Sequence, residues 1–269
     1  MKRYTPVLTI AGSDSGGGAG IQADIKTISA CGCFGTSAIT ALTAQNTLGV
    51  TDIHPVPVQT IEAQIRAVLD DIGTDAVKLG MLHSVEVIEC VANLLVEYQI
   101  SNIVLDPVMV ATSGDKLIQD EAIAALQETL FPIVRLITPN IPEAEIISGK
   151  TITDKVQLGE TAEQLARRFH LSVLAKGGHL DDEHLEDILY DYELSQSQSF
   201  TNRRVATRNT HGTGCTLSSA LASFLARGYS IAESADKAIS YVATAIDTGA
   251  GYRFGEGHGP VHHFHAFWK

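Results

Sequence analysis

Short apolar runs alternate with helix-length amphipathic segments along most of the chain, and this rhythm constrains the fold more than any other feature. The expected buried strands cover residues 7–10, 38–42, 76–81, 102–108, 136–138 and 172–176. The expected helices cover residues 21–29, 61–72, 84–97, 121–130 and 158–169. Strands separated by helices form right-handed βαβ units, so the pattern predicts a parallel sheet with helices on both faces.

The rhythm changes in the last third of the chain. Residues 187–192 and 199–206 read as consecutive strands, which predicts an antiparallel hairpin, and two long helices follow at 216–227 and 231–248. Of the 269 residues, 45% are hydrophobic, which is enough for a sizeable core and too many for a disordered chain. We therefore expect residues 1–269 to form one doubly wound α/β domain.

Charge and cysteine content exclude several classes of protein. The formal net charge is −12, which argues against binding to a nucleic-acid backbone, because such proteins carry clustered Lys and Arg. No apolar run approaches the ~20 residues of a membrane-spanning helix. Cys31, Cys33, Cys90 and Cys215 show no paired framework, so we expect a protein of the reducing cytoplasm.

A glycine-rich turn, residues 11–20, follows the first expected strand. Glycines let a ligand approach the backbone, and the end of this strand lies at the sheet edge where open α/β folds bind ligands. Gly18, Gly20 and Ala23 match a loosened dinucleotide-binding pattern. That reading is disfavoured because Gln45 stands near the position where the pattern needs an acidic residue. The alternative that residues 11–20 form a tight turn and bind no ligand also stays open.

The segment Thr210–Thr216 opens a late apolar helix with small residues. Unpaired amides and the helix dipole favour an anion there, so we predict that Gly212, Thr213 and Gly214 form a hole for a phosphate or phosphoryl group. Cys215 falls in the first helical turn, where the thiolate is favoured, and could act as a base or nucleophile. The alternative is a buried cysteine that packs under the turn.

Polar residues follow three further expected strands. Asp106 and Glu143 carry the carboxylates that Mg²⁺ prefers, and Asn140 could hold a water of the metal. Lys176 could contact a nucleotide phosphate. Because parallel strands end at one edge, we expect these side chains to lie together. The alternatives are local: a turn at Asp106, a helix start stabilised by Glu143, and a solvated Lys176.

The tail of the chain carries four histidines, His258, His262, His263 and His265. Loop histidines of this kind are more often exposed than bound to a metal. We therefore predict no structural metal in the tail.

Seven segments carry a resemblance that extends over almost the whole chain. They are residues 11–24, 43–46, 78–81, 106–109, 138–140 with Glu143, 211–218 and 257–261. Together they resemble the hydroxymethylpyrimidine/phosphomethylpyrimidine kinases of thiamine biosynthesis, within the ribokinase-like superfamily. The resemblance implies a ribokinase-like fold and ATP-dependent phosphorylation of 4-amino-5-hydroxymethyl-2-methylpyrimidine, followed by phosphorylation of the monophosphate.

The resemblance also implies roles for particular residues. Asp24 and Gln45 would lie against the pyrimidine and its exocyclic amine. Gly12, Met81 and Val108 would shape the pocket around the ring, in keeping with the apolar walls that such ligands need. ATP would be the phosphoryl donor with Mg²⁺, K⁺ stays open as a further cation, and a homodimer is expected.

Cys215 separates this branch from the sugar kinases of the superfamily, which carry an aspartate base at the same place. A thiol pKa near 8.5 must be lowered before Cys215 can act at neutral pH. Two alternatives stay open. A pyridoxal or pyridoxine kinase has a similar architecture, and its aldehyde substrate could add to the Cys215 thiolate. A non-catalytic sensor would bind the pyrimidine without ATP turnover.

Overall fold

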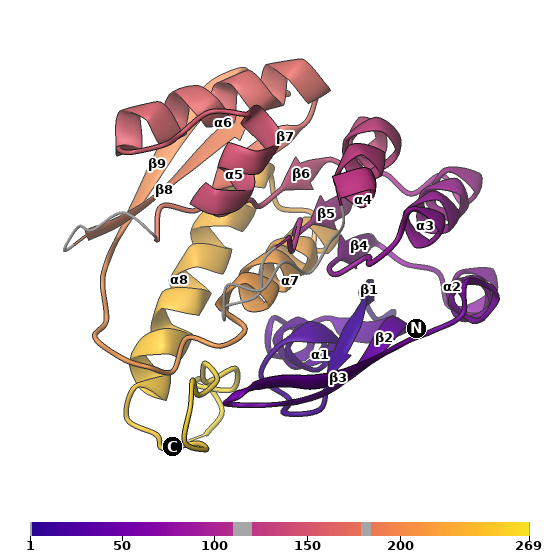
Figure 1. The fold of residues 1–269 in the computed structure, drawn as a ribbon, viewed down its shortest axis with the longest axis horizontal. Coiled ribbons are helices and arrows are strands. Elements are labelled where there is room, and N and C mark those ends of the chain that lie inside the picture. Colours follow the sequence, from indigo (N-terminus) through magenta and orange to yellow (C-terminus); the bar gives the residue numbers. More distant parts are fainter. Residues whose placement is uncertain (1, 110–119, 179–183, 269) are drawn as a thin grey trace.

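The computed structural model describes residues 2–109, 120–178 and 184–268. Its strands are β1 (Pro6–Asp14), β2 (Phe34–Asn46), β3 (Gly49–Pro55), β4 (Ala76–Leu79), β5 (Ile103–Leu105), β6 (Leu136–Ile137), β7 (Ser172–Ala175), β8 (His184–Asp191) and β9 (Gln196–Arg203). These described strands form one sheet in the order β3-β2-β1-β4-β5-β6-β7-β8-β9 (Figure 1). The six strands from β2 to β7 in that order are parallel, and β3, β8 and β9 each pair antiparallel with the strand before them in the chain. The predicted mostly parallel sheet and late antiparallel hairpin are confirmed.

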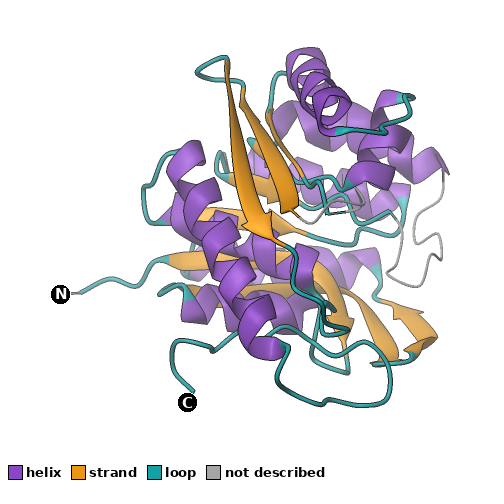
Figure 2. Ribbon diagram, turned by 90° about the vertical axis from the view of Figure 1, so that its left-hand side faces the viewer, coloured by secondary structure: helices purple, strands orange, loops and turns teal. Residues whose placement is uncertain are grey.

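Helices lie on both sides of the sheet, as Figure 2 shows. They are α1 (Gly20–Ala30), α2 (Val58–Asp71), α3 (Val85–Glu97), α4 (Asp120–Ala125), the π-helical turn η1 (Leu126–Leu130), the 3-10 turn η2 (Phe131–Ile133), α5 (Ile141–Ser148), α6 (Lys155–Phe169), α7 (Thr213–Ala226) and α8 (Ile231–Gly249). One layer contains α1, α7 and α8, and the other contains α2 to α6. The doubly wound architecture is thereby confirmed.

Strand β1 shows why the central strands are apolar throughout. Val7 packs into the core beneath α1, α7 and α8, whereas Leu8 and Ile10 pack into the opposite core. Successive side chains of a strand point to opposite faces, so a strand covered on both sides must be apolar at every position. The same burial holds β1 firmly and directs its end, and the turn that follows, to one edge of the sheet.

Two elements, β3 and α5, were not predicted. Six of the seven residues of β3 are exposed, so no buried face imposes a period on its sequence. Helix α5 is short and follows β6 after only three residues, and only its start was considered, as the local alternative for Glu143. The expected helix at residues 121–130 is observed as α4 followed by the wider turn η1.

Candidate active site

The carboxyl ends of the parallel strands meet at one edge of the sheet. There β1 runs into the glycine-rich turn, Asp106 follows β5, and Lys176 follows β7. The first turn of α7 packs against this edge, because a Cβ on Gly214 would lie 3.2 Å from Asp106 Oδ2 and 3.4 Å from Lys176 Nζ. The structure thus brings the predicted anion hole to the strand ends.

Asp14 organises the glycine-rich turn. Its carboxylate accepts hydrogen bonds from the amides of Gly16, Gly18 and Ala19 at 2.8, 3.0 and 2.8 Å. Burial by itself would raise the pKa of Asp14, but the bond to His211 and the amide donors outweigh burial and hold the pKa below its usual value. The turn is therefore built around a carboxylate that stays charged.

His211 joins the glycine-rich turn to the loop that enters α7. Its Nε2 lies 2.9 Å from Asp14 Oδ2 and 3.4 Å from Gln45 Nε2. The backbones also meet, since a Cβ on Gly212 would lie 1.8 Å from the carbonyl oxygen of Gly18. Gly212 has φ +80°, so both its conformation and this contact require glycine. Sequence reasoning gave neither His211 nor Asp14 a role, because a contact across 197 residues leaves no local signal.

Cys215 is half-buried in the first turn of α7, and the Gly20 amide acts to lower the pKa of its thiol. Burial raises the pKa of the Cys215 thiol to about 11. The ammonium of Lys78 opposes this increase, while the carboxylates of Asp24 and Asp106 add to it. The expectation that the helix N-terminus favours the thiolate is therefore wrong for this state of the protein.

The predicted anion hole lies at the N-terminus of α7, which Gly212 caps. The Thr213 amide and Thr213 Oγ1 both donate to the carbonyl of Thr210, at 3.2 and 2.7 Å. The Thr213 amide, one of the three predicted to bind the anion, is therefore already used in a hydrogen bond within the turn. A bound phosphate would have to displace that contact or use the amides of Gly212 and Gly214.

Asp106 and Lys176 form an ion pair beside this turn. Lys176 Nζ lies 3.1 Å from Asp106 Oδ1, which also accepts a hydrogen bond from Thr138 Oγ1 at 3.2 Å. Burial opposes the charge on Lys176, but Asp106 and Glu143 outweigh it and raise the pKa of the ammonium. The Lys176 side chain is 16% exposed, so a charged donor suited to a phosphate is accessible from solvent.

Glu143 and Asn140 form a capping box at the start of α5. Asn140 Oδ1 accepts from the Glu143 amide, and Glu143 Oε2 accepts from the Asn140 amide, each at 2.9 Å. The local alternative for Glu143, a carboxylate that stabilises a helix start, is confirmed. Burial raises the pKa of Glu143, and Asp106 adds to the increase against the opposing charge of Lys176.

A divalent cation fits this edge only together with a ligand. No group of three His, Cys, Asp or Glu side chains suited to a metal occurs in the part of the chain that the structure describes. Mg²⁺ in nucleotide sites is usually bound by one or two carboxylates, substrate phosphates and waters. Asp106 and Glu143, which interact electrostatically with each other and with Lys176, meet that requirement.

Three of the residues expected to line a ring-binding pocket lie at strand ends: Gly12 near the end of β1, Met81 after β4 and Val108 after β5. A Cβ on Gly12 would lie 2.8 Å from Met81 Cε, so glycine at this position makes room for the thioether. Val108 is half-buried. Gln45, at the end of β2, lies beside His211, and Thr43 Oγ1 donates to Gln45 Oε1 at 3.2 Å. Contact of these four residues with a ring stays a prediction.

Asp24 lies elsewhere than the resemblance implies. Its side chain is completely buried, and its carboxylate accepts hydrogen bonds from Thr9 at 2.6 Å, from Ser219 at 2.7 Å and twice from Lys78 at 2.9 Å. Both carboxylate oxygens are thus occupied within the protein, which corrects the expectation that Asp24 lies against a pyrimidine. The missed signal was Lys78, a lysine inside an apolar strand.

The tail of the chain contacts both the β2–β3 hairpin and the loop before α7. The His258 amide donates to the carbonyl of Thr47 at 2.9 Å, at the tip of the β2–β3 hairpin. The His211 amide donates to the carbonyl of Gly259 at 3.0 Å, and the Val261 amide donates back to His211 at 3.4 Å. The tail therefore links the hairpin to the loop before α7.

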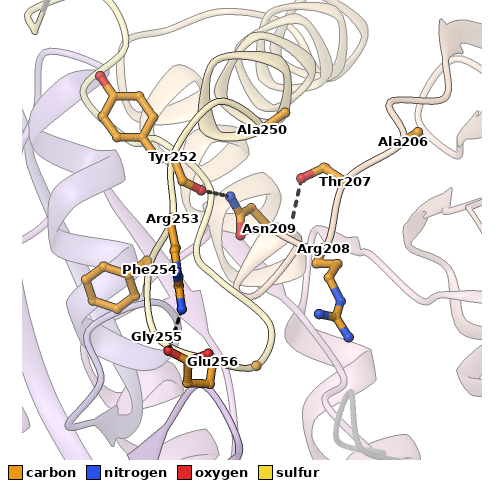
Figure 3. A pocket seen from close by; sticks show the side chains of 11 residues that line it. Ala206, Thr207, Arg208, Asn209, Ala250, Tyr252, Arg253, Phe254, Gly255 and Glu256 are labelled. Atoms are coloured by element: carbon orange, nitrogen blue, oxygen red, sulfur yellow. Dashed lines mark hydrogen bonds and ion pairs between the residues drawn. The ribbon is translucent and has the colours of Figure 1, made fainter.

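A pocket of 710 Å³ opens between residues 206–209 and 250–257 (Figure 3). Asn209 connects its two sides, because Asn209 Nδ2 donates to the carbonyls of Gly249 and Tyr252 at 2.7 Å each. None of the predicted site residues, all of which the structure describes, lines this pocket. The pocket borders the loop that precedes α7. It is separate from the candidate active site described above.

Comparison with known proteins gives one consistent relationship. Residues 14–262 match the family described as phosphomethylpyrimidine kinase. The chain is 48% identical over 258 residues to a hydroxymethylpyrimidine/phosphomethylpyrimidine kinase of Bacillus subtilis, covering 96% of this chain and 94% of that protein. A crystal structure of phosphomethylpyrimidine kinase from Clostridium difficile superposes with a TM-score of 0.80 at 44% identity, over 90% and 99% of the two chains. The structure of a pyridoxal kinase from Staphylococcus aureus in complex with ADP superposes with a TM-score of 0.90 at 31% identity. The match covers 99% of this chain and 96% of that chain.

Proposed function

This chain belongs to the phosphomethylpyrimidine kinase family, and on that premise we propose its reaction. It transfers the terminal phosphoryl group of ATP to the hydroxymethyl oxygen of 4-amino-5-hydroxymethyl-2-methylpyrimidine, and then phosphorylates the resulting monophosphate. The protein is a phosphotransferase that serves thiamine biosynthesis.

The observation that carries this proposal is the contact between the glycine-rich turn and the start of α7. Gly212 packs on the carbonyl of Gly18, and the Gly20 amide lowers the pKa of the Cys215 thiol. Gln45 faces His211 in the same region. A small pyrimidine alcohol held beside Gln45 would present its hydroxyl group toward the anion hole.

The proposed transfer needs little covalent chemistry from the protein. The hydroxymethyl oxygen attacks the γ-phosphorus in line, the bond to ADP breaks, and Cys215 takes up the hydroxyl proton. The amides of Gly212, Thr213 and Gly214 stabilise the charge on the phosphoryl oxygens. Positioning and charge stabilisation dominate such reactions, because their transition state is loose. Cys215 holds a proton in the free protein, so that proton must leave before Cys215 can act.

We assign the phosphate side of the site to Asp106, Asn140, Glu143 and Lys176. Mg²⁺, when bound, neutralises charge on the ATP phosphates. Asp106 and Glu143 would hold the ion and its waters, with Asn140 beside them. Lys176 would exchange its contact with Asp106 for a phosphate oxygen. Participation of K⁺ stays a prediction.

A second candidate substrate is favoured by the likeness to a pyridoxal kinase structure. A half-buried thiol such as Cys215 could add reversibly to the aldehyde of pyridoxal. Parallel measurements of ATP consumption with the pyrimidine alcohol, pyridoxal and pyridoxine rank the three substrates. Binding of the pyrimidine without ATP turnover in the presence of Mg²⁺ would instead indicate a sensor.

Location and assembly also stay predictions. All four cysteines are free, as expected of a protein in the reducing cytoplasm. Within the residues that the structure describes, no helix has both the length and the apolar character needed to span a bilayer. The expected homodimer is tested by the molar mass of the protein in solution.

Substitution of the thiol tests the proposed function. Cys215→Ala should fold, bind the pyrimidine alcohol as the wild type does, and lose about 100–10,000-fold in turnover, the range typical of a general base. Calorimetric titration with the pyrimidine and single-turnover transfer from ATP measure the two properties. Cys90→Ala, a change of a half-buried cysteine in α3, is the matched control and should retain activity. Single-turnover rates of Cys215→Ala equal to wild type would remove the thiol from the reaction.

A further inference from the structure

Lys78 is a fully buried lysine in the middle of the sheet. Its side chain and that of Asp24 are both 0% exposed, and Lys78 Nζ donates to both carboxylate oxygens of Asp24 at 2.9 Å. Removing two charges from water is costly, and apolar residues of similar volume often stabilise a fold equally well or better. The pair therefore calls for an explanation beyond packing.

The position of the pair relative to α7 supplies that explanation. Ser219 donates to Asp24 Oδ1 at 2.7 Å, and Ser219 stands four residues after Cys215 in the same helix. Residues four apart lie on one face of a helix, so the thiol and the ion pair lie along the same face of α7. Lys78 Nζ is also packed tightly against the backbone of Gly80, since a Cβ at Gly80 would lie 2.9 Å from it.

Five groups from different elements influence the thiol of Cys215. The positive ones are the ammonium of Lys78 from β4 and that of Lys176 after β7. The negative ones are the carboxylates of Asp24 from α1 and Asp106 after β5, and the fifth is the Gly20 amide, which lowers the pKa of the thiol. Lys176 faces solvent and would be occupied by a phosphate during the reaction. Lys78 is fully buried, so its ammonium group stays at the same position throughout the reaction.

We propose that Lys78 is a positioning residue whose buried positive charge stabilises the thiolate form of Cys215, while Asp24 and Ser219 hold it beneath the first turns of α7. This inference rests on the proposed function, in which Cys215 must lose its proton before it accepts one from the substrate. Lys78 touches neither substrate in this assignment and acts only through the thiol. Among the charged neighbours of Cys215, Lys78 has the largest effect and lowers the pKa of the thiol.

The rate of alkylation tests the proposal without any need for turnover, because iodoacetamide reacts with the thiolate alone. The rate is measured at about pH 9, below the pKa of the thiol, and is followed by mass spectrometry of the Cys215 peptide. The variants are Lys78→Met, the charge-free Lys78→Met/Asp24→Asn, and Ser219→Ala, which loosens the same site without changing charge. Cys90 in α3 is an internal control in every sample.

Loss of the Lys78 charge should slow alkylation of Cys215 about tenfold or more, which corresponds to the smallest pKa change usually produced by an opposite charge. The slowing should be greater in Lys78→Met than in the double variant, and Cys90 should react as before. Turnover should fall while KM for the pyrimidine and for ATP stays unchanged.

Two results would overturn the proposal. One is a wild-type alkylation rate in the folded double variant, and the other is equal slowing in Ser219→Ala, which would make the pair structural. Both are distinct from failure of the proposed function, in which wild-type protein would alkylate normally and phosphorylate no pyrimidine.

Discussion

Two Lys–Asp ion pairs flank the first turns of α7, and they differ in access to solvent. Lys78 and Asp24 are 0% exposed, whereas Lys176 and Asp106 are 16% and 4% exposed. In both pairs burial opposes the charge on the lysine, and the nearby carboxylates outweigh burial and raise the lysine pKa. Both ammonium groups are therefore charged at neutral pH.

The difference in access separates two ways in which a cation can act. Lys176 can exchange its partner Asp106 for an incoming phosphate, because it reaches the surface. Lys78 can exchange nothing, because both oxygens of Asp24 and the surrounding core enclose it. An open pair can bind a ligand, while a sealed pair can only change the electrostatic potential at its neighbours.

The largest expected effect comes from the open pair. Lys176→Met should lower turnover about 100–1,000-fold, the usual cost of losing one group that stabilises developing charge. KM for ATP should rise in the same variant, because the phosphates lose a contact. Steady-state kinetics with varied ATP measure both quantities, and unchanged kinetics would show that the open pair binds no phosphate.

The next largest effect is on stability and comes from the sealed pair. Lys78→Met should lower the free energy of unfolding by about 3–5 kcal/mol, because it leaves the buried carboxylate of Asp24 without a cation. A lysine whose pKa is raised above 10.5 contributes its full stability below that pH and loses it only as the pH rises further. Urea denaturation at neutral pH therefore measures the whole contribution.

The charge-free variant sharpens this result. Lys78→Met/Asp24→Asn should recover most of the lost stability, since no buried charge remains unpaired and the introduced amide oxygen can still accept from Thr9. Recovery of stability without recovery of the thiol reactivity would separate the two roles of the pair. A double variant as unstable as Lys78→Met would mean that shape, and not charge, governs this site.

The smallest expected effect concerns the capping box beside the open pair. Asn140→Ala should cost about 1 kcal/mol, because the Glu143 amide loses its acceptor. Asn140→Asp should keep the cap, since Asp and Asn are similar at this position. Thermal unfolding of the two variants measures the cap, and their activities reveal any separate role of the amide near the metal.

Burial explains how much of the fold could be predicted from sequence. Strands β1, β4 and β7 are covered on both faces, so their apolar runs were recognisable. Strand β3 has almost no buried face, and its existence depends on pairing with β2, which no periodicity reveals. Helix α5 was hidden because its first turn also carries the residues read as metal ligands.

The candidate site divides along a similar line. Residues in turns at strand ends, such as Asp106 and Lys176, were identifiable because topology alone brings them to one edge. The contact between Ser219 and Asp24 and the contact between Asp14 and His211 were not identifiable, since each joins segments far apart in the chain. The thiol of Cys215 was misjudged for a related reason: a helix N-terminus is visible in sequence, but neighbouring carboxylates are not.

Synthesis from the first residue onward would complete every described strand before the tail segment 257–261 emerges from the ribosome. That segment contacts Thr47 on one side and His211 on the other, so it joins the β2–β3 hairpin to the loop before α7 after the sheet has formed. We therefore expect a nascent or prematurely terminated chain that lacks the tail to form its sheet without this link between the hairpin and the start of α7.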